Sequence, residues 1–232
     1  MTISLLTYDA TTGIYGAAAT TGNLCVGGWV LRGGPDTGLS ASQGALPSTL
    51  WGETVLSRMR DGASAEKAVA ETVAADPGRA HRQLAALDPG GGSGVFTGEA
   101  NIPAAGARRG ANAIAAGNML ADAATLDACL EAYLAAEGPM PDRLLTALDA
   151  AAAAGGDARG LRSAALLVAA RDAPPLDLRI DHDAAPLAAL RTLLDLTRGA
   201  AYRDWVSRLP TPDDPHRARP DAPGGASLAP IP

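Results

Sequence analysis

The sequence is poor in the residues on which many catalytic and structural sites are built. Its 232 residues include two cysteines, Cys25 and Cys129, which lie far apart without a Cys-x-x-Cys motif. This spacing supports neither a zinc site nor a disulfide framework, so two reduced, buried thiols are expected. With only three histidines and no Gly-x-Ser-x-Gly motif, a Ser-His-Asp triad is poorly supported.

Basic clusters and long apolar runs are also scarce. The formal net charge is −6, and the adjacent basic pair Arg108-Arg109 is interpreted as a solvated turn, so no nucleic-acid surface is expected. No apolar run approaches the ~20 residues of a membrane span, and the N-terminus lacks the basic region of a signal peptide. The expected partner is therefore a small molecule rather than a nucleic acid or a membrane, and the expected location is the cytoplasm.

The order of the predicted elements indicates an α+β fold. Residues 1–209 are expected to form one domain, followed by a Pro-rich tail, 210–232, which should be disordered. Strands are predicted at 1–8, 14–20, 23–31, 39–43, 82–87, 94–97, 113–117, 161–169 and 176–180, and helices at 48–60, 64–75, 121–136, 140–154 and 185–197. Strands and helices in blocks, rather than in strict alternation, favour a sandwich of antiparallel sheets.

The first two predicted strands form a hairpin that places Thr2 at its open end. Asp9 to Gly13 is the turn, with an Asx-type residue at its start and a glycine for positive φ. A methionine followed by a small residue is the usual substrate for removal of the initiator, which would leave Thr2 with a hydroxyl and an α-amine. Because the reference pKa of that amine is about 8, it could accept the hydroxyl proton while the hydroxyl attacks a carbonyl.

Polar residues at the ends of other predicted strands are candidates for a binding site. Ser42 and Gln43 end one strand and Asn118 follows another, although each could equally satisfy turn backbone. The segment 155–160, Gly-Gly-Asp-Ala-Arg-Gly, is more distinctive, because a helix cap explains its glycines but not Asp157 and Arg159 at the mouth of the next strand.

The tripeptide Asp181-His182-Asp183 has side chains that could ligate a metal ion. A turn capped by an aspartate is the favoured interpretation, because the tripeptide stands where a strand leads into a helix. A metal-dependent hydrolase is therefore a distant alternative, and neither a metal nor a cofactor is expected.

Several stretches in chain order resemble the DUF1028 family, which is grouped with the N-terminal-nucleophile (Ntn) hydrolase-like fold. The matching stretches are 2–4, 9–16, 75–79 with 82–83, 96–98, 117–120, 155–160, 163–166 and 177–182. The resemblance implies a four-layer αββα sandwich in which Thr2 begins a central strand. It implies little about the substrate.

The hypothesis that follows is a hydrolase acting on a small amide or related C–N bond. Thr2 would be the nucleophile, Asn118 and backbone N–H groups would hold the oxyanion, and Asp157 with Arg159 would orient the amine or the substrate. The floor of the pocket would be made by Thr20, Thr21 or Ser163.

Departures from the family pattern keep a second hypothesis open. Residues 20–23, Thr-Thr-Gly-Asn, stand where the family usually has a lysine or arginine, and 106–110 lack a usual histidine, while Arg162 replaces a usual glutamine. A non-catalytic ligand-binding or accessory protein on the same scaffold is therefore the alternative. Because paired sandwiches often associate, a homo-oligomer is compatible with either hypothesis.

Overall fold

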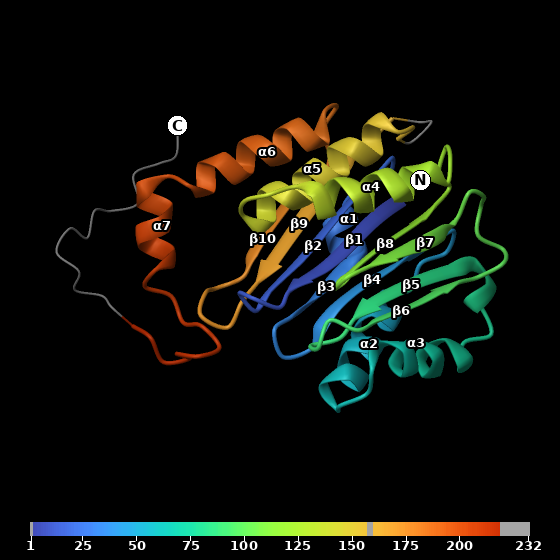
Figure 1. The fold of residues 1–232 in the computed structure, drawn as a ribbon, viewed down its shortest axis with the longest axis horizontal. Coiled ribbons are helices and arrows are strands. Elements are labelled where there is room, and N and C mark those ends of the chain that lie inside the picture. Colours follow the sequence, from blue (N-terminus) through green and yellow to red (C-terminus); the bar gives the residue numbers. More distant parts are fainter. Residues whose placement is uncertain (1, 157–159, 219–232) are drawn as a thin grey trace.

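Two antiparallel sheets lie face to face at the centre of the computed structural model, which describes residues 2–156 and 160–218 (Figure 1). The first sheet has the order β10-β9-β2-β1-β8-β7, with strands Leu176–Ile180, Ser163–Ala169, Ile14–Thr21, Thr2–Asp9, Ala113–Asn118 and Gly106–Gly110. The second has the order β3-β4-β5-β6, with strands Leu31–Gly34, Gly38–Gly44, Arg82–Leu87 and Ser93–Thr97.

Helices cover both outer faces of the paired sheets (Figure 1). The first sheet is covered by α4 (Ala124–Ala135), α5 (Met140–Ala153) and α6 (Pro186–Thr197), and the second by α2 (Thr49–Arg60) and α3 (Ala65–Ala74). The remaining helices are α1 (Val26–Trp29), η1 (Arg79–His81) and α7 (Ala200–Val206). The predicted α+β sandwich of antiparallel sheets is thus confirmed, with its layers in the order α, β, β, α.

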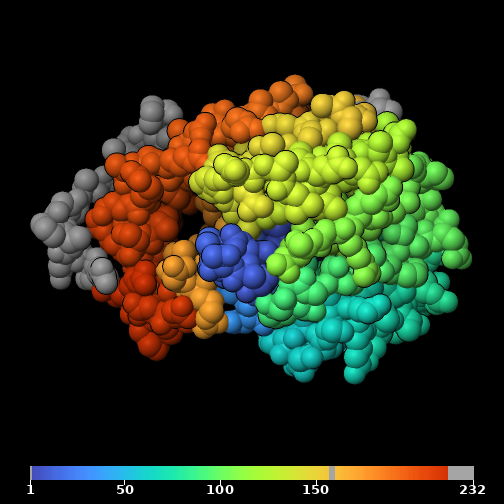
Figure 2. Space-filling view, in the orientation of Figure 1, coloured from blue at the N-terminus to red at the C-terminus, as the bar shows by residue number. Residues whose placement is uncertain are grey.

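The alternation of side chains along the strands divides the apolar residues into three cores. Leu5 belongs to the core under α4 and α5, whereas Leu6 belongs to the core between the sheets, and Val55 of α2 packs on the second sheet. Because Thr2 has the same parity as Leu6, its side chain faces the layer between the sheets. The predicted β1–β2 hairpin is confirmed, and Figure 2 shows its turn in blue between the helical layers.

The predicted strand 23–31 is wrong, because the chain forms the short helix α1 there before β3 begins. The Ser163 hydroxyl donates to the Asn23 carbonyl (2.8 Å) and accepts from the Val26 N–H (3.1 Å), so β9 holds the chain in a bend. A Cβ on Gly27 would lie 2.8 Å from that of Ala165, so only glycine lets the helix pack this closely on β9.

Arg108-Arg109 lies in a strand rather than in a solvated turn. Both residues belong to β7 at the edge of the first sheet, and Arg108 pairs with Asp127 of α4 at 2.5 Å. Edge strands often carry charged side chains, which interrupt the alternation of apolar and polar residues by which a strand is predicted.

The described chain also extends past the predicted domain limit at residue 209. The α7 helix was not predicted, and beyond it Thr211 is buried and forms a bridge with Asp214. The Asp213 N–H donates to the Arg171 carbonyl, and the two side chains form an ion pair. The part of the predicted tail from 219 onward lies outside the described residues.

Among the described helices, none combines the length and apolarity that crossing a lipid bilayer demands.

Candidate functional site

A pocket of about 660 Å³ opens at the end of the sandwich where β1 begins. It is lined by Thr2, Thr21, Asn23, Leu24, Cys25, Val26, Trp29, Val30, Gln43, Gly44, Ala45, Leu46, Pro47, Ile102, Asn118 and Met119. These residues come from both sheets, from α1 and from the loops that follow β2, β4, β6 and β8. The volume falls within the range that small-molecule sites occupy.

Thr2 lies in this pocket beside two polar residues of the neighbouring strands. In the strand register it stands directly opposite Thr21 of β2 and Asn118 of β8. The hydroxyl oxygens of Thr2 and Thr21 lie 3.0 Å apart, so either hydroxyl can donate to the other. Directly opposed residues have Cβ atoms about 5 Å apart and share one face of a sheet, which brings the Asn118 amide alongside the Thr2 hydroxyl.

Asn118 presents an unusual buried donor. Its side chain is only 1% exposed, and its Nδ2 has no hydrogen-bond partner among the described residues. A buried donor without a partner is disfavoured by about 1–3 kcal/mol, so its presence in a pocket lining points to a ligand that accepts from it.

Gln43, which also lines the pocket, presents the complementary group, and the structure fixes which of its amide atoms is left without a partner. The Nε2 of the neighbouring Gln83 lies 2.9 Å from the Gly117 carbonyl oxygen and 3.0 Å from that of Gly106, and carbonyl oxygens can only accept. The Oε1 of Gln83 must therefore face Gln43, whose Nε2 donates to it at 2.7 Å. The Gln43 Oε1 is left buried, with no partner among residues 2–156 and 160–218.

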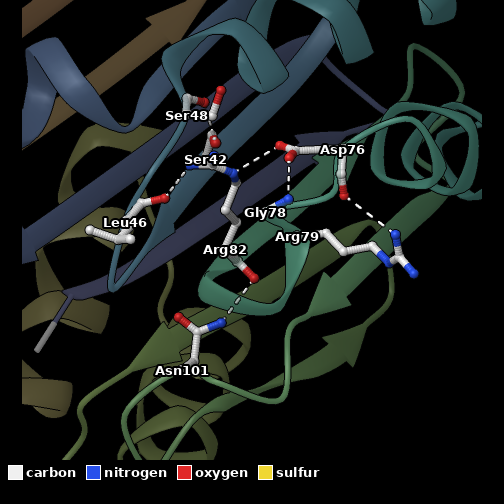
Figure 3. A network of polar contacts seen from close by, with 8 residues as sticks. All are labelled: Ser42, Leu46, Ser48, Asp76, Gly78, Arg79, Arg82 and Asn101. Atoms are coloured by element: carbon white, nitrogen blue, oxygen red, sulfur yellow. Dashed lines mark hydrogen bonds and ion pairs between the residues drawn. The ribbon is translucent and has the colours of Figure 1, made fainter.

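The wall made by residues 44–47 is held in place by a polar network around Arg82 (Figure 3). The Arg82 guanidinium donates to the Leu46 carbonyl (2.5 Å) and to the Asp76 carboxylate (2.8 Å), and stacks over Trp51. Asn101 accepts from the Ala45 N–H (3.0 Å) and donates to the Arg82 carbonyl (2.9 Å). The stretch around Asp76 thus positions one wall of the pocket.

The charge of Asp76 suits this role. Desolvation raises the pKa of Asp76. Hydrogen bonds from the Gly78 N–H and from Arg82, together with the charge of Arg82, lower it by a larger amount, so the resulting pKa lies below the ordinary value. The carboxylate is therefore ionised throughout the physiological range. It keeps the Arg82 side chain directed at the loop.

Of the site residues predicted from the sequence, Thr2, Thr21, Gln43 and Asn118 come together in the pocket. Ser42 does not, because its hydroxyl faces α2 and donates to the Ser48 carbonyl at 2.7 Å (Figure 3).

Thr20 and Ser163 are buried and do not line the pocket. The Thr20 hydroxyl donates to the Ser163 carbonyl (2.9 Å), and Ser163 holds the bend before α1, so both support the wall from behind. Asp157 and Arg159 lie outside the described residues.

Neither Gln83 nor the apolar rim of the pocket was predicted from the sequence as part of the site. Gln83 had a detectable signal, since the chain has only two glutamines and each falls at an inward position of a strand. The rim consists of Leu24, Trp29, Leu46 and Ile102, which are between 47% and 59% exposed. A patch of large exposed apolar side chains around a pocket is typical of a binding surface.

Backbone strain also gathers at this pocket. Cys25 and Met119, both in the lining, have φ values of +60° and +53°, which residues with a Cβ rarely adopt. Such strain is common at ligand-binding sites, where the surrounding structure enforces it. Cys25 is half-buried rather than buried as predicted, whereas Cys129 is buried in the α4 layer.

No group of three His, Cys, Asp or Glu side chains in the described part of the chain comes close enough to hold a metal ion. The Asp183 carboxylate accepts from the Ala185 N–H at 2.7 Å, so the 181–183 tripeptide forms a turn closed by an aspartate, but Asp183 does not cap α6, whose N-cap residue is Ala185.

The fold and the pocket define a two-sheet α+β sandwich with a polar cluster at the start of its first strand, and comparison with known proteins places this architecture in a family. The model of the family described as "Family of unknown function (DUF1028)" matches residues 2–190, so the chain belongs to that family. The crystal structure of protein SPO2555 from Silicibacter pomeroyi, assigned to DUF1028, is similar, with 47% sequence identity, a TM-score of 0.91, and coverage of 95% of this chain and 96% of that one. No curated protein matches this sequence.

Proposed function

We propose that the protein is an N-terminal-nucleophile hydrolase that cleaves a small amide or a related C–N bond, with Thr2 as the nucleophile. The observation that carries this proposal is the placement of the Thr2 hydroxyl in a pocket opposite the buried, unpartnered amide of Asn118. The two-sheet sandwich with Thr2 at the start of a central strand is also the arrangement that the Ntn-hydrolase-like fold implies.

The mechanism requires Thr2 to be the first residue of the mature chain, after removal of Met1. The α-amine of Thr2 then takes the hydroxyl proton as Oγ1 forms a bond to the substrate carbonyl carbon. Collapse of the tetrahedral intermediate breaks the C–N bond, and the amine returns the proton to the departing nitrogen. Water, deprotonated by the same amine, then attacks the ester, releases a carboxylic acid and restores Thr2.

Two neighbours support this sequence of steps. The Asn118 Nδ2 would donate to the developing oxyanion, and a single such donor is worth about 10²–10³ in rate. The Thr21 hydroxyl, 3.0 Å from that of Thr2, would orient the nucleophile.

The test combines intact mass spectrometry with three variants assayed against a panel of carboxamides by amine release. The mass should show that Met1 is absent, Thr2→Ala should lose about 10³-fold or more in rate, and Thr2→Ser should keep measurable turnover. Thr12→Ala, in the exposed turn at the other end of the hairpin, is the matched control and should behave as wild type. Retention of Met1 on active protein, or full activity in Thr2→Ala, would refute the mechanism.

The second candidate is a non-catalytic ligand-binding protein on the same scaffold. It is favoured by residues 20–23, which place uncharged side chains where the family usually has a cation. Ligand-induced stabilisation without turnover, in protein that keeps Met1, is the expected result for this candidate. The cytoplasmic location proposed from the sequence would be tested by cell fractionation.

A further inference from the structure

The two unpartnered groups of the pocket form a matched pair. Asn118 Nδ2 is a donor and Gln43 Oε1 is an acceptor, and each belongs to a side chain that is 1% exposed. They lie on facing sheets and are linked through Gln83, which accepts from Gln43 and donates to the carbonyl of Gly117, the residue before Asn118. The site therefore offers one donor and one acceptor that the described protein does not itself satisfy.

The chemistry of the remaining lining is apolar and uncharged. Among the lining residues that the structure describes, no side chain carries a formal charge, and the rim around Trp29 exposes large apolar groups. The α-amine of Thr2 acts as the base only in its unprotonated form, so in the reactive state it adds no charge either. An ionised ligand would then lose its hydration here without meeting an opposite charge, which is unfavourable. A neutral ligand with an apolar substituent fits the lining better.

We propose that the pocket recognises a neutral carboxamide that carries an N–H and an apolar acyl substituent. The carbonyl oxygen accepts from Asn118 Nδ2, the amide N–H donates to Gln43 Oε1, and the acyl substituent packs against Trp29 and the rim. This inference deepens the proposed function and rests on it, since this amide is the one that Thr2 would attack. Gln43 is thereby a specificity-determining residue for amides over esters.

The selectivity follows from the unpaired acceptor. An ester has the same carbonyl but no N–H, so it leaves Gln43 Oε1 buried without a donor. Binding sites that accept a hydrogen bond from a substrate N–H strongly reject analogues that lack this group. A carboxylate places a negative oxygen against the same acceptor. We expect the amide to bind at least about 10-fold more tightly than the matched ester or carboxylate.

The experiment measures binding to the Thr2→Ala variant by calorimetry, so that turnover does not enter the result. The probes are propionamide, 4-methylpentanamide and phenylacetamide, each beside its methyl ester and its carboxylate. Affinity should rise with the apolar substituent within the amides, and each amide should exceed its ester. Equal binding of amide and ester, preference for the carboxylate, or no binding by any probe would overturn the proposal.

Variants separate the two contacts. In Gln43→Met the amide should lose its advantage, with amide and ester within about threefold of each other, whereas in Asn118→Leu both should weaken and their ratio should persist. The ratio is measured within one variant and is therefore independent of any loss of stability, which a thermal melt monitors. An unchanged ratio in Gln43→Met would exclude the role of Gln43.

The apolar contact has its own matched control. Trp29→Ala should weaken phenylacetamide binding about 5- to 10-fold, since a wall of the pocket is lost. Trp205→Ala, which removes a similarly exposed tryptophan outside the pocket, should leave it unchanged. Equal effects of the two variants would show that the phenyl ring of phenylacetamide does not pack on Trp29.

Failure of this inference and failure of the proposed function are distinguishable. If the Thr2→Ala variant binds amides selectively but the wild type shows no turnover, the proposed hydrolase function is refuted and the proposed recognition of amides stands. Turnover of amides and esters alike by wild type, without selective binding, would keep the hydrolase and refute the role of Gln43.

Discussion

Replacement of Gln83 by leucine should destabilise the protein strongly, because this buried side chain joins the two sheets. Gln83 is fully buried, accepts from Gln43 Nε2, and places its own Nε2 near the carbonyls of Gly117 and Gly106 and near the Thr97 hydroxyl. Leucine has a similar volume but offers none of these contacts. Its apolar surface therefore compensates only in part for the polar atoms left unpaired.

The magnitude follows from those polar atoms. Gln43 Nε2 and the carbonyl of Gly117 both belong to buried residues and lose their partner, and each such loss is worth about 1–3 kcal/mol. The carbonyl of half-buried Gly106 can turn to water at a smaller loss. The expected decrease in the free energy of unfolding is about 3 kcal/mol, a large share of the ~5–15 kcal/mol typical of a domain.

Urea denaturation followed by far-ultraviolet circular dichroism and by tryptophan fluorescence would measure this decrease. With a slope of about 3 kcal/mol/M, the midpoint should fall by about 1 M. Thr97→Val, which removes only one of the contacts of Gln83, is the matched control and should lose about 0.5–1 kcal/mol. A loss in Gln83→Leu below about 1 kcal/mol, or equal to that of Thr97→Val, would refute the view that Gln83 connects the sheets.

Three further predictions concern titratable groups. Desolvation raises the pKa of the Cys129 thiol to about 12, so a thiol reagent should modify only half-buried Cys25 in native protein and both cysteines after denaturation. Rapid modification of both cysteines in native protein would contradict this prediction. Desolvation likewise raises the pKa of Tyr15 to about 12, above its ordinary ~10, so the stability it contributes is complete below pH ~10 and decreases as the pH rises toward 12. Burial also raises the pKa of Tyr133, so the late step in tyrosinate absorbance should decrease by the amplitude of one tyrosine in Tyr15→Phe. A profile that is identical in the two proteins would count against the burial of Tyr15. The pKa of Asp76 is lowered, because the hydrogen bonds from Gly78 and Arg82 outweigh desolvation. The stability that Asp76 contributes is therefore present above its unfolded pKa of about 3.9 and is lost as the pH falls further. Asp76→Asn should flatten the acid limb of a curve of stability against pH, and an unchanged limb would argue against the ion pair with Arg82.

Local sequence patterns predicted most of the elements correctly because their signals are local. The Asp9–Gly13 turn between two apolar runs specifies a hairpin, and alternation or helical spacing specifies strands such as β9 and helices such as α5. The pattern failed where a distant contact overrides local preference. Within the predicted strand 23–31, residues Val26–Trp29 instead form helix α1, because Ser163, on a strand far along the chain, binds the backbone of Asn23 and Val26.

The candidate site divides in the same way. The position of Thr2 at a strand end, and the polar character of Gln43 and Asn118, can be read along the chain itself. Which polar residues converge cannot, since Ser42 is adjacent to Gln43 yet faces the opposite layer.

The sequence by itself thus determined the class of fold, the hairpin and the identity of the residue at its open end, because periodicity and turn chemistry act over a few neighbouring residues. Only the tertiary structure decided that Thr2, Thr21 and Asn118 stand side by side, because strand register is a long-range property. It alone decided that the Gln43 Oε1 is left without a partner, because two backbone carbonyls of the opposite sheet orient Gln83, and Gln83 in turn orients Gln43.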